Sequence, residues 1–103
     1  MKLSYHRYQA PSIKSRIETY DFYLKEQTLD RFKNKSCGWA EAGLCPFHDD
    51  HSSGSFRVNL ESGAYKCFSC DAKGKDIIAF TMAKYNLSFY EALKQLANEW
   101  GVY

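Results

Sequence analysis

The chain has 103 residues, of which 45% are hydrophobic and 25% charged, with a formal net charge of +2, the balance of one small globular domain. No run of apolar residues is close to the length of about 20 that a membrane-spanning helix needs. The opening "MKLSYHRYQAPS" lacks the apolar core of a secretory signal. We therefore expect no membrane segment and a cytoplasmic, nucleoid-associated location, where cysteines are more often metal ligands or free thiols than disulfides.

The charge is unevenly distributed. Residues 1–40 contain eight Lys and Arg against four Asp and Glu, whereas residues 41–103 contain six against eight. A second small basic group consists of Arg57, Lys66, Lys73 and Lys75. This distribution is compatible with nucleic-acid binding but does not demand it.

The N-terminal part is expected to be helical after an irregular arm. Residues 1–11 form that arm, in which His6 is interpreted as a surface histidine. Ser12, which follows Pro11, is the expected N-cap, and residues 13–32 continue as one helix or two short ones. The polar residues and glycines of "KNKSCGWAEAG" are expected to end it.

Shorter elements typical of strands follow. "WAEAGLCPF" is interpreted as a strand that leads into a tight turn, and "HDDHSSGS" as a polar loop. "SFRVNL" alternates Phe56 and Val58 with Arg57 and Asn59, which predicts a half-exposed strand. "ESG" is the expected hairpin turn and "AYKCFSC" the returning strand.

Two helices are predicted at the C-terminal end. Asp76 is placed to cap "IIAFTMAKY" over residues 77–85. Ser88 and Glu91 form an S-x-x-E capping box before "FYEALKQLANEW" over residues 89–100, and Gly101 suits the end of that helix.

Two ligand pairs predict a metal site. Cys45 and His48 are separated by two residues, as are Cys67 and Cys70, and 18 residues lie between the pairs. Zinc prefers four nitrogen or sulfur ligands in a tetrahedron. A ligand pair on a tight turn, called a knuckle here, supplies two of them, so two knuckles joined by a hairpin supply all four. The ion would close a sheet whose core is too small to be stable alone. Buried thiols or disulfides explain this paired spacing less well.

The ligand set has alternatives. Cys37 could replace His48 and give an all-thiolate site with Cys45, Cys67 and Cys70, but it shares no knuckle with another cysteine. Alternatively, His51 could serve in place of His48 if its loop folds back. We prefer the two paired knuckles. Four protein ligands leave no open position, so the site is predicted to be structural, with Asp49 and Asp50 as part of a solvated loop.

The stretch "GLCPFHDDHSSGSFRVN…AYKCFSCDAKGKDIIAFTM" resembles the zinc-binding domain at the N-terminus of bacterial and phage-type DNA primases. The resemblance covers residues 43–82. Gly54 stands where this family usually has proline, and Ser69 and Asp71 stand where glycines are usual, which bears on the local turns. The matching positions are Cys45, Pro46, Phe47, His48, Ser55, Phe56, Val58, Tyr65, Cys67, Phe68, Cys70, Gly74 and Ile77.

The resemblance implies a zinc-ribbon sheet that contacts single-stranded template DNA and helps to choose the initiation site. It also implies a partner, namely a separate primase polymerase domain. Primer synthesis belongs to the polymerase domain with its acidic metal-binding residues, so these residues are not expected to catalyse it by themselves.

The sequence thus predicts a small α+β domain, divided into an arm and helical segment (1–36), a zinc-bound antiparallel ribbon (37–76) and two C-terminal helices packed on it (77–103). Phe56 is assigned to the core, while Tyr65 and Phe68 stay open between core and base stacking. The predicted DNA contacts are Arg57, Asn59, Tyr65, Lys66, Phe68, Lys73 and Lys75.

Two other function classes are open. The chain could be a protein-interaction adaptor that docks on a replicative helicase or a separate polymerase subunit. Its surface would then be formed by the helices at 77–85 and 89–100, with Tyr85, Tyr90 and Trp100. It could instead be a zinc-dependent regulator that reads duplex DNA, although no helix rich in Arg, Asn or Gln is evident.

Overall fold

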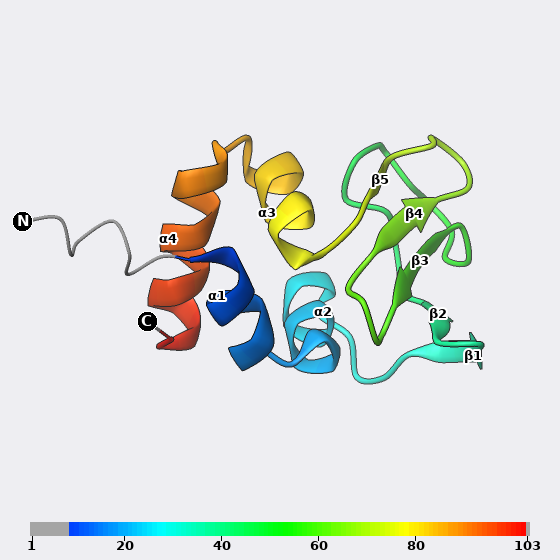
Figure 1. Cartoon of the computed structure of the whole chain (residues 1–103). Helices are drawn as coiled ribbons and strands as arrows, with labels where there is room; N and C mark the ends of the chain where they lie inside the picture. Colours follow the sequence, from blue (N-terminus) through cyan, green and yellow to red (C-terminus); the bar gives the residue numbers. More distant parts are fainter. Residues whose placement is uncertain (1–8, 103) are drawn as a thin grey trace, which may run out of the picture.

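The computed structural model describes residues 9–102, so the predictions for the first eight residues, His6 among them, lie outside the described part. Four helices gather at one end of the molecule and an antiparallel sheet lies at the other (Figure 1). The predicted α+β class is confirmed. No helix within residues 9–102 has the length and apolarity needed to cross a bilayer. The helices are α1 (Ala10–Arg16), α2 (Thr19–Gln27), α3 (Ile77–Tyr85) and α4 (Phe89–Trp100).

The sheet has five short strands, each antiparallel to its neighbour in chain order. In β3, Phe56 and Val58 are buried while Arg57 and Asn59 are partly exposed, which confirms the predicted alternation. One face of the sheet therefore packs on the core and the other faces solvent. The strands are β1 (Lys33–Ser36), β2 (Trp39–Glu41), β3 (Phe56–Asn59), β4 (Tyr65–Cys67) and β5 (Lys73–Gly74).

Strand β1 lies in a stretch that was expected only to break the helical segment. All four of its residues are polar and exposed, as suits an edge strand, so it has no alternation of apolar and polar residues. The turn to β2 has positive φ at Cys37 (52°) and at Gly38 (84°). Two-residue hairpin turns of type I′ need this pair of angles, but Cys-Gly is not their usual Asn-Gly sequence.

The first helix begins earlier than predicted. Ser12 is not the N-cap: α1 starts at Ala10 with Gln9 as its cap, and Pro11 lies in the first turn. Proline is favoured there because the first turn does not need its missing N–H. Ile17 is extended, with φ −115° and ψ 120°, so residues 10–27 form two helices and not one.

The predicted caps of the C-terminal helices are confirmed. The Asp76 carboxylate accepts a hydrogen bond of 2.8 Å from the N–H of Ala79. The Ser88 hydroxyl accepts from the N–H of Glu91, and the Glu91 carboxylate accepts in return from the N–H of Ser88. Gly101 ends α4 with φ 65°.

Phe80 of α3 joins the helices to the sheet. Its side chain is fully buried and meets the neighbouring rings at centroid distances of 5.1 to 6.2 Å, mostly edge to face. Aromatic pairs in these arrangements add to the stability that burial alone provides. The rings around it are those of Phe22, Tyr23, Phe47, Phe56 and Tyr65.

Gly74 is required by the packing of this aromatic cluster. It lies opposite Tyr65 in the β4–β5 ladder. A Cβ atom at position 74 would overlap the Tyr65 ring, which stacks on Phe47 at 5.3 Å and cannot withdraw. The glycine that the motif shares with the primase family thus allows the close approach of β5 to β4.

We predict that Phe80→Ala lowers the free energy of unfolding of the metal-loaded protein by about 3–5 kcal/mol, because it removes the ring on which both parts of the core pack. Urea unfolding followed by circular dichroism measures this. Phe89→Ala is the matched control, since the Phe89 side chain is 51% exposed and its loss should cost no more than about 0.5 kcal/mol. Equal losses in the two variants would contradict the central role of Phe80.

Candidate metal centre

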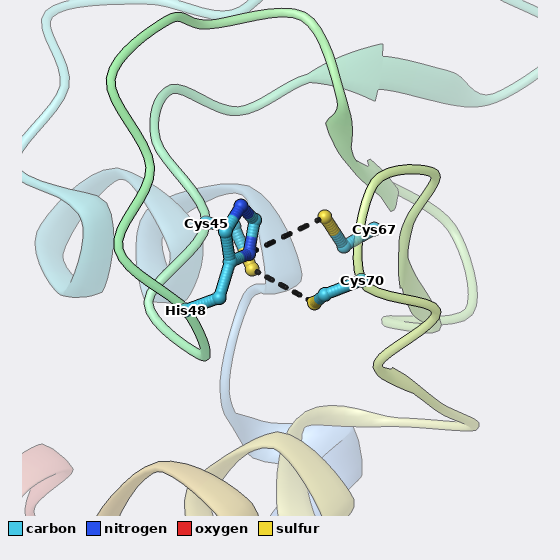
Figure 2. A group of neighbouring side chains, drawn as sticks. All are labelled: Cys45, His48, Cys67 and Cys70. Atoms are coloured by element: carbon cyan, nitrogen blue, oxygen red, sulfur yellow. Dashed lines mark hydrogen bonds between the residues drawn. The ribbon is translucent and has the colours of Figure 1, made fainter.

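The four predicted ligands form one cluster. The donor atoms of Cys45, His48, Cys67 and Cys70 all lie within 4.8 Å of one another. Figure 2 shows the side chains converging from two segments, the loop after β2 and the end of β4 with the turn that follows it. The antiparallel pairing of β3 and β4 sets these segments side by side, since Phe56 lies opposite Cys67.

The two knuckles share one local geometry. The N–H of Phe47 points at the Cys45 sulfur from 3.3 Å, and the N–H of Ser69 points at the Cys67 sulfur from 3.4 Å. In both cases the donor lies two residues after the cysteine. Hydrogen bonds of this kind favour the charged thiolate, the form of cysteine that binds a metal.

The distances fit a zinc ion. In a tetrahedral site with zinc–sulfur bonds of about 2.3 Å, neighbouring sulfurs are about 3.8 Å apart. The Cys45 and Cys70 sulfurs are separated by 3.8 Å, and the Cys67 sulfur lies 3.9 Å from Nδ1 of His48. Three sulfurs and one imidazole nitrogen are a typical donor set for structural zinc. Because the protein supplies all four ligands, no position is left for a substrate.

Burial shapes the chemistry of the thiols. Burial raises the pKa of Cys45 to about 12, since a thiolate there is removed from water and its neighbours are further thiols. Burial also opposes the thiolate of Cys67, but hydrogen bonds from the N–H groups of Cys70 and Ser69, together with those from the Cys45 and Cys70 thiols, outweigh it, and the pKa of Cys67 is lowered. A zinc ion supplies the positive charge that favours the thiolate at every position, so its binding releases protons.

Asp50 supports the site from outside the ligand set. Its side chain is only 9% exposed; one carboxylate oxygen accepts a 2.8 Å hydrogen bond from the N–H of Cys45, and the other lies 3.6 Å from Nε2 of His48. The hydrogen bond from Cys45 lowers the pKa of Asp50 and so keeps the carboxylate charged. A carboxylate behind a ligating imidazole orients the ring toward the metal.

The expectation of a solvated loop therefore holds for Asp49 and is wrong for Asp50. The Asp49 side chain is 92% exposed and pairs with His51, which is itself 84% exposed. His51 and Cys37 lie outside the cluster, which excludes both alternative ligand sets among the described residues. The sequence carries no signal that separates Asp50 from Asp49, because the contact depends on how the loop folds around the His48 ring.

The predicted DNA contacts are divided between the two faces of the sheet. Arg57, Lys66 and Lys73 share the outer face, and the Phe68 side chain beside them is 62% exposed. Tyr65, left open between stacking and core, is 4% exposed and belongs to the core.

The remaining predicted contacts differ in their surroundings. The side-chain oxygen of Asn59 accepts from the N–H groups of Glu61 and Ser62 and so shapes the β3–β4 turn. Lys75 is exposed just after β5. Trp39, which the sequence interpretation did not select, lies on the outer face next to the predicted cations, opposite Asn59 in the ladder.

We predict that Asp50→Asn weakens zinc affinity about 10- to 100-fold, because the amide loses the negative charge behind His48. Competition with a chromogenic chelator measures it. Asp49→Asn makes the same chemical change one residue away on an exposed side chain and should leave the affinity unchanged. If both variants hold zinc as tightly as the parent chain, the supporting role of Asp50 is wrong.

The comparisons with known proteins agree with this geometry. The family described as CHC2 zinc finger matches residues 12–103. The DNA primase of Helicobacter pylori (strain ATCC 700392 / 26695) is 38% identical over 92 residues, which are 88% of this chain and 16% of the relative. The DNA primase of Clostridium acetobutylicum is 41% identical over 70 residues, 68% of this chain and 11% of the relative.

A solved structure is also similar. It is the crystal structure of the Aquifex aeolicus primase with its zinc-binding and RNA polymerase domains, with a TM-score of 0.66 and 28% sequence identity. The match covers 90% of this chain and 21% of that one, so the chain spans only a small part of the relatives it resembles. With its four-ligand cluster and this family match, the chain belongs to the CHC2 zinc finger family of DNA primases and holds one structural zinc ion.

Proposed function

We propose that the chain is the single-stranded DNA-binding module of a DNA primase or primase-like protein and acts in primer initiation. The observation that carries the proposal is a row of charged residues across the outer face of the sheet. Direct cross-strand partners connect one residue in each strand from β1 to β5. This charged row consists of Lys33, Glu41, Arg57, Lys66 and Lys73.

Like charges lie next to one another in the charged row, and their repulsion lowers the stability of the sheet. An anionic ligand that binds the row would offset this repulsion. Arg57 lies directly opposite Lys66, and Lys66 lies directly opposite Lys73. Like charges in such positions destabilise a sheet. Glu41 and Asp71 offset part of the repulsion at 3.4 Å from Arg57 and Lys66, but partly exposed pairs of this kind contribute little. A nucleic-acid backbone would offset the repulsion more completely.

An exposed ring beside the row favours a single strand. The Lys66 ammonium lies 5.3 Å from the centre of the Phe68 ring, and that ring is largely open to solvent. Proteins that bind single strands combine cations for the phosphates with rings for the bases, which are accessible only when unpaired. Lys73 and Lys75 extend the basic surface along the edge of the sheet.

The relatives suggest the context of this binding. They are named DNA primases, and the similar crystal structure combines zinc-binding and RNA polymerase domains. We therefore propose that a polymerase domain performs primer synthesis while this chain holds the template. A replicative helicase is a further proposed partner, and the nucleoid is the proposed place of action.

A second candidate is a protein-interaction adaptor. Three aromatic side chains at the α3–α4 junction, Tyr85, Phe89 and Tyr90, are 41% to 51% exposed. Trp100 does not join them, because it lies between the Phe22 ring and the Lys25 ammonium. Capture of a replication protein in nuclease-treated samples, lost on mutation of Phe89, would favour this function.

We predict that the double change Arg57→Ala and Lys66→Ala weakens single-strand binding and flattens its salt dependence. The slope of log affinity against log salt should fall by about 1.4, or 0.7 for each lost phosphate contact. Fluorescence anisotropy with a labelled oligonucleotide at several salt concentrations measures both quantities. The duplex of the same sequence serves as the competing ligand.

Lys94→Ala is the control for this experiment, since Lys94 is an exposed lysine of α4 outside the charged row. It should leave the affinity and the slope unchanged. Equal effects of the control and the double variant, or preference for the duplex, would contradict the proposed surface.

We also predict that Glu41→Gln tightens single-strand binding about 2- to 5-fold at low salt. The Glu41 carboxylate repels phosphates, and its ion pair with Arg57 competes with them for the guanidinium. The Glu41 carboxylate accepts a 2.7 Å hydrogen bond from the Asn34 amide, and glutamine can keep that bond. Glu99→Gln, on α4, removes the same charge outside the row and should have no effect. Weaker binding by Glu41→Gln would show that the row does not contact phosphates.

A further inference from the structure

The outer face of the sheet carries a hollow that the charged row alone does not explain. It has a volume of about 520 Å³, within the range of about 300–1,000 Å³ of small-molecule sites. Two rings and two cations surround it, a combination suited to a flat aromatic ligand that carries negative charge. The residues around it are Ser36, Trp39, Arg57, Lys66 and Phe68.

Trp39 is held on this face by the sheet itself. Its backbone pairs with Ser36 on one side and with Asn59 on the other, in the strand between β1 and β3. Ala40, the next residue, is fully buried, so the alternation of the strand directs the indole ring outward. Because strands on both sides fix its backbone, Trp39 presents its ring at a defined place on the outer face.

A second hollow adjoins the first. It measures about 480 Å³ and shares Trp39 and Lys66 with it, while Lys73 and Lys75 lie at its other side. Trp39 therefore lies where the two hollows meet. A strand of nucleic acid that runs from one hollow to the other passes the boundary that Trp39 and Lys66 share, with further cations available in each hollow.

We propose that an unpaired DNA base stacks on Trp39 in the first hollow, with Phe68 as the second ring, while Arg57 and Lys66 bind the flanking phosphates. The strand then continues past Trp39 toward Lys73 and Lys75. This inference rests on the proposed single-strand binding and adds to it a site for one base. The site selects a base by its flat apolar faces and accepts it only when it is unpaired.

The test uses the tryptophan emission of the zinc-loaded protein during titration with an unlabelled single-stranded oligonucleotide, alongside anisotropy with a labelled one. Stacking should quench the emission of the parent chain, and the quench should be absent in Trp39→Phe, in which Trp100 is the remaining tryptophan. Trp39→Phe keeps a β-forming aromatic residue, and its zinc content shows that it is folded.

A matched oligonucleotide with abasic positions sharpens the test. Trp39→Ala should weaken binding of the normal strand at least about fivefold, the lower end of measured stacking contributions. It should have little effect on the abasic strand, which keeps the phosphates but offers no base at those positions. Phe68→Ala should behave in the same way, whereas Phe89→Ala, an exposed ring on α4, should affect neither strand.

The possible failures are distinguishable. Two results would overturn the base site and leave the proposed function intact. One is tight binding by anisotropy without a quench of the Trp39 emission. The other is an equal loss of affinity for the normal and the abasic strand in Trp39→Ala. Absence of single-strand binding by the parent chain would overturn both.

Discussion

The convergence of two ligand pairs on one tetrahedral centre is the constraint on which the rest of this structure depends. The strands contain only two to four residues each, at or below the lower end of the usual strand length, so the sheet has little ladder and little buried surface of its own. The zinc ion fastens the loop after β2 to the turn after β4, so the β3–β4 hairpin between them is held at both ends. Metal binding and folding of this end are therefore expected to be coupled.

The metal-bound end is coupled to the helices by aromatic side chains and by a few specific polar contacts. Phe47 lies between the two ligands of its knuckle in sequence, and its ring packs on Tyr65 and Phe80. The Tyr23 hydroxyl donates a 2.6 Å hydrogen bond to the carbonyl of Gly63 in the β3–β4 turn. One face of the sheet is thus committed to the core, which leaves the opposite face open to solvent.

Much of this arrangement was predictable because its signals are local. The spacing of Cys45, His48, Cys67 and Cys70 predicted the metal cluster, and the alternation in β3 predicted which side of the sheet is buried. β1 was missed since an exposed edge strand carries no apolar pattern and its turn is closed by Cys37 and not by asparagine.

Other features depend on contacts between distant parts of the chain. Asp50 gains its role only from the position of the His48 ring, and Trp39 gains its own from the strands on either side. The charged row becomes visible only when the register of all five strands is known, because its members are spread over residues 33–73. In a hairpin the register follows from the local turn, but the pairing of β2 with β3 joins segments on either side of the first ligand pair, so the row cannot be found in any one short stretch of sequence.

We propose that the zinc-fastened sheet presents its outer face to single-stranded DNA. Amide chemical-shift mapping of the zinc-loaded protein, titrated with an unlabelled single-stranded oligonucleotide, tests it most directly. The account predicts that the shifts concentrate in β2, β3 and β4 around Trp39, Arg57 and Lys66. Shifts concentrated instead at the α3–α4 junction, or none at a saturating oligonucleotide concentration, would contradict it.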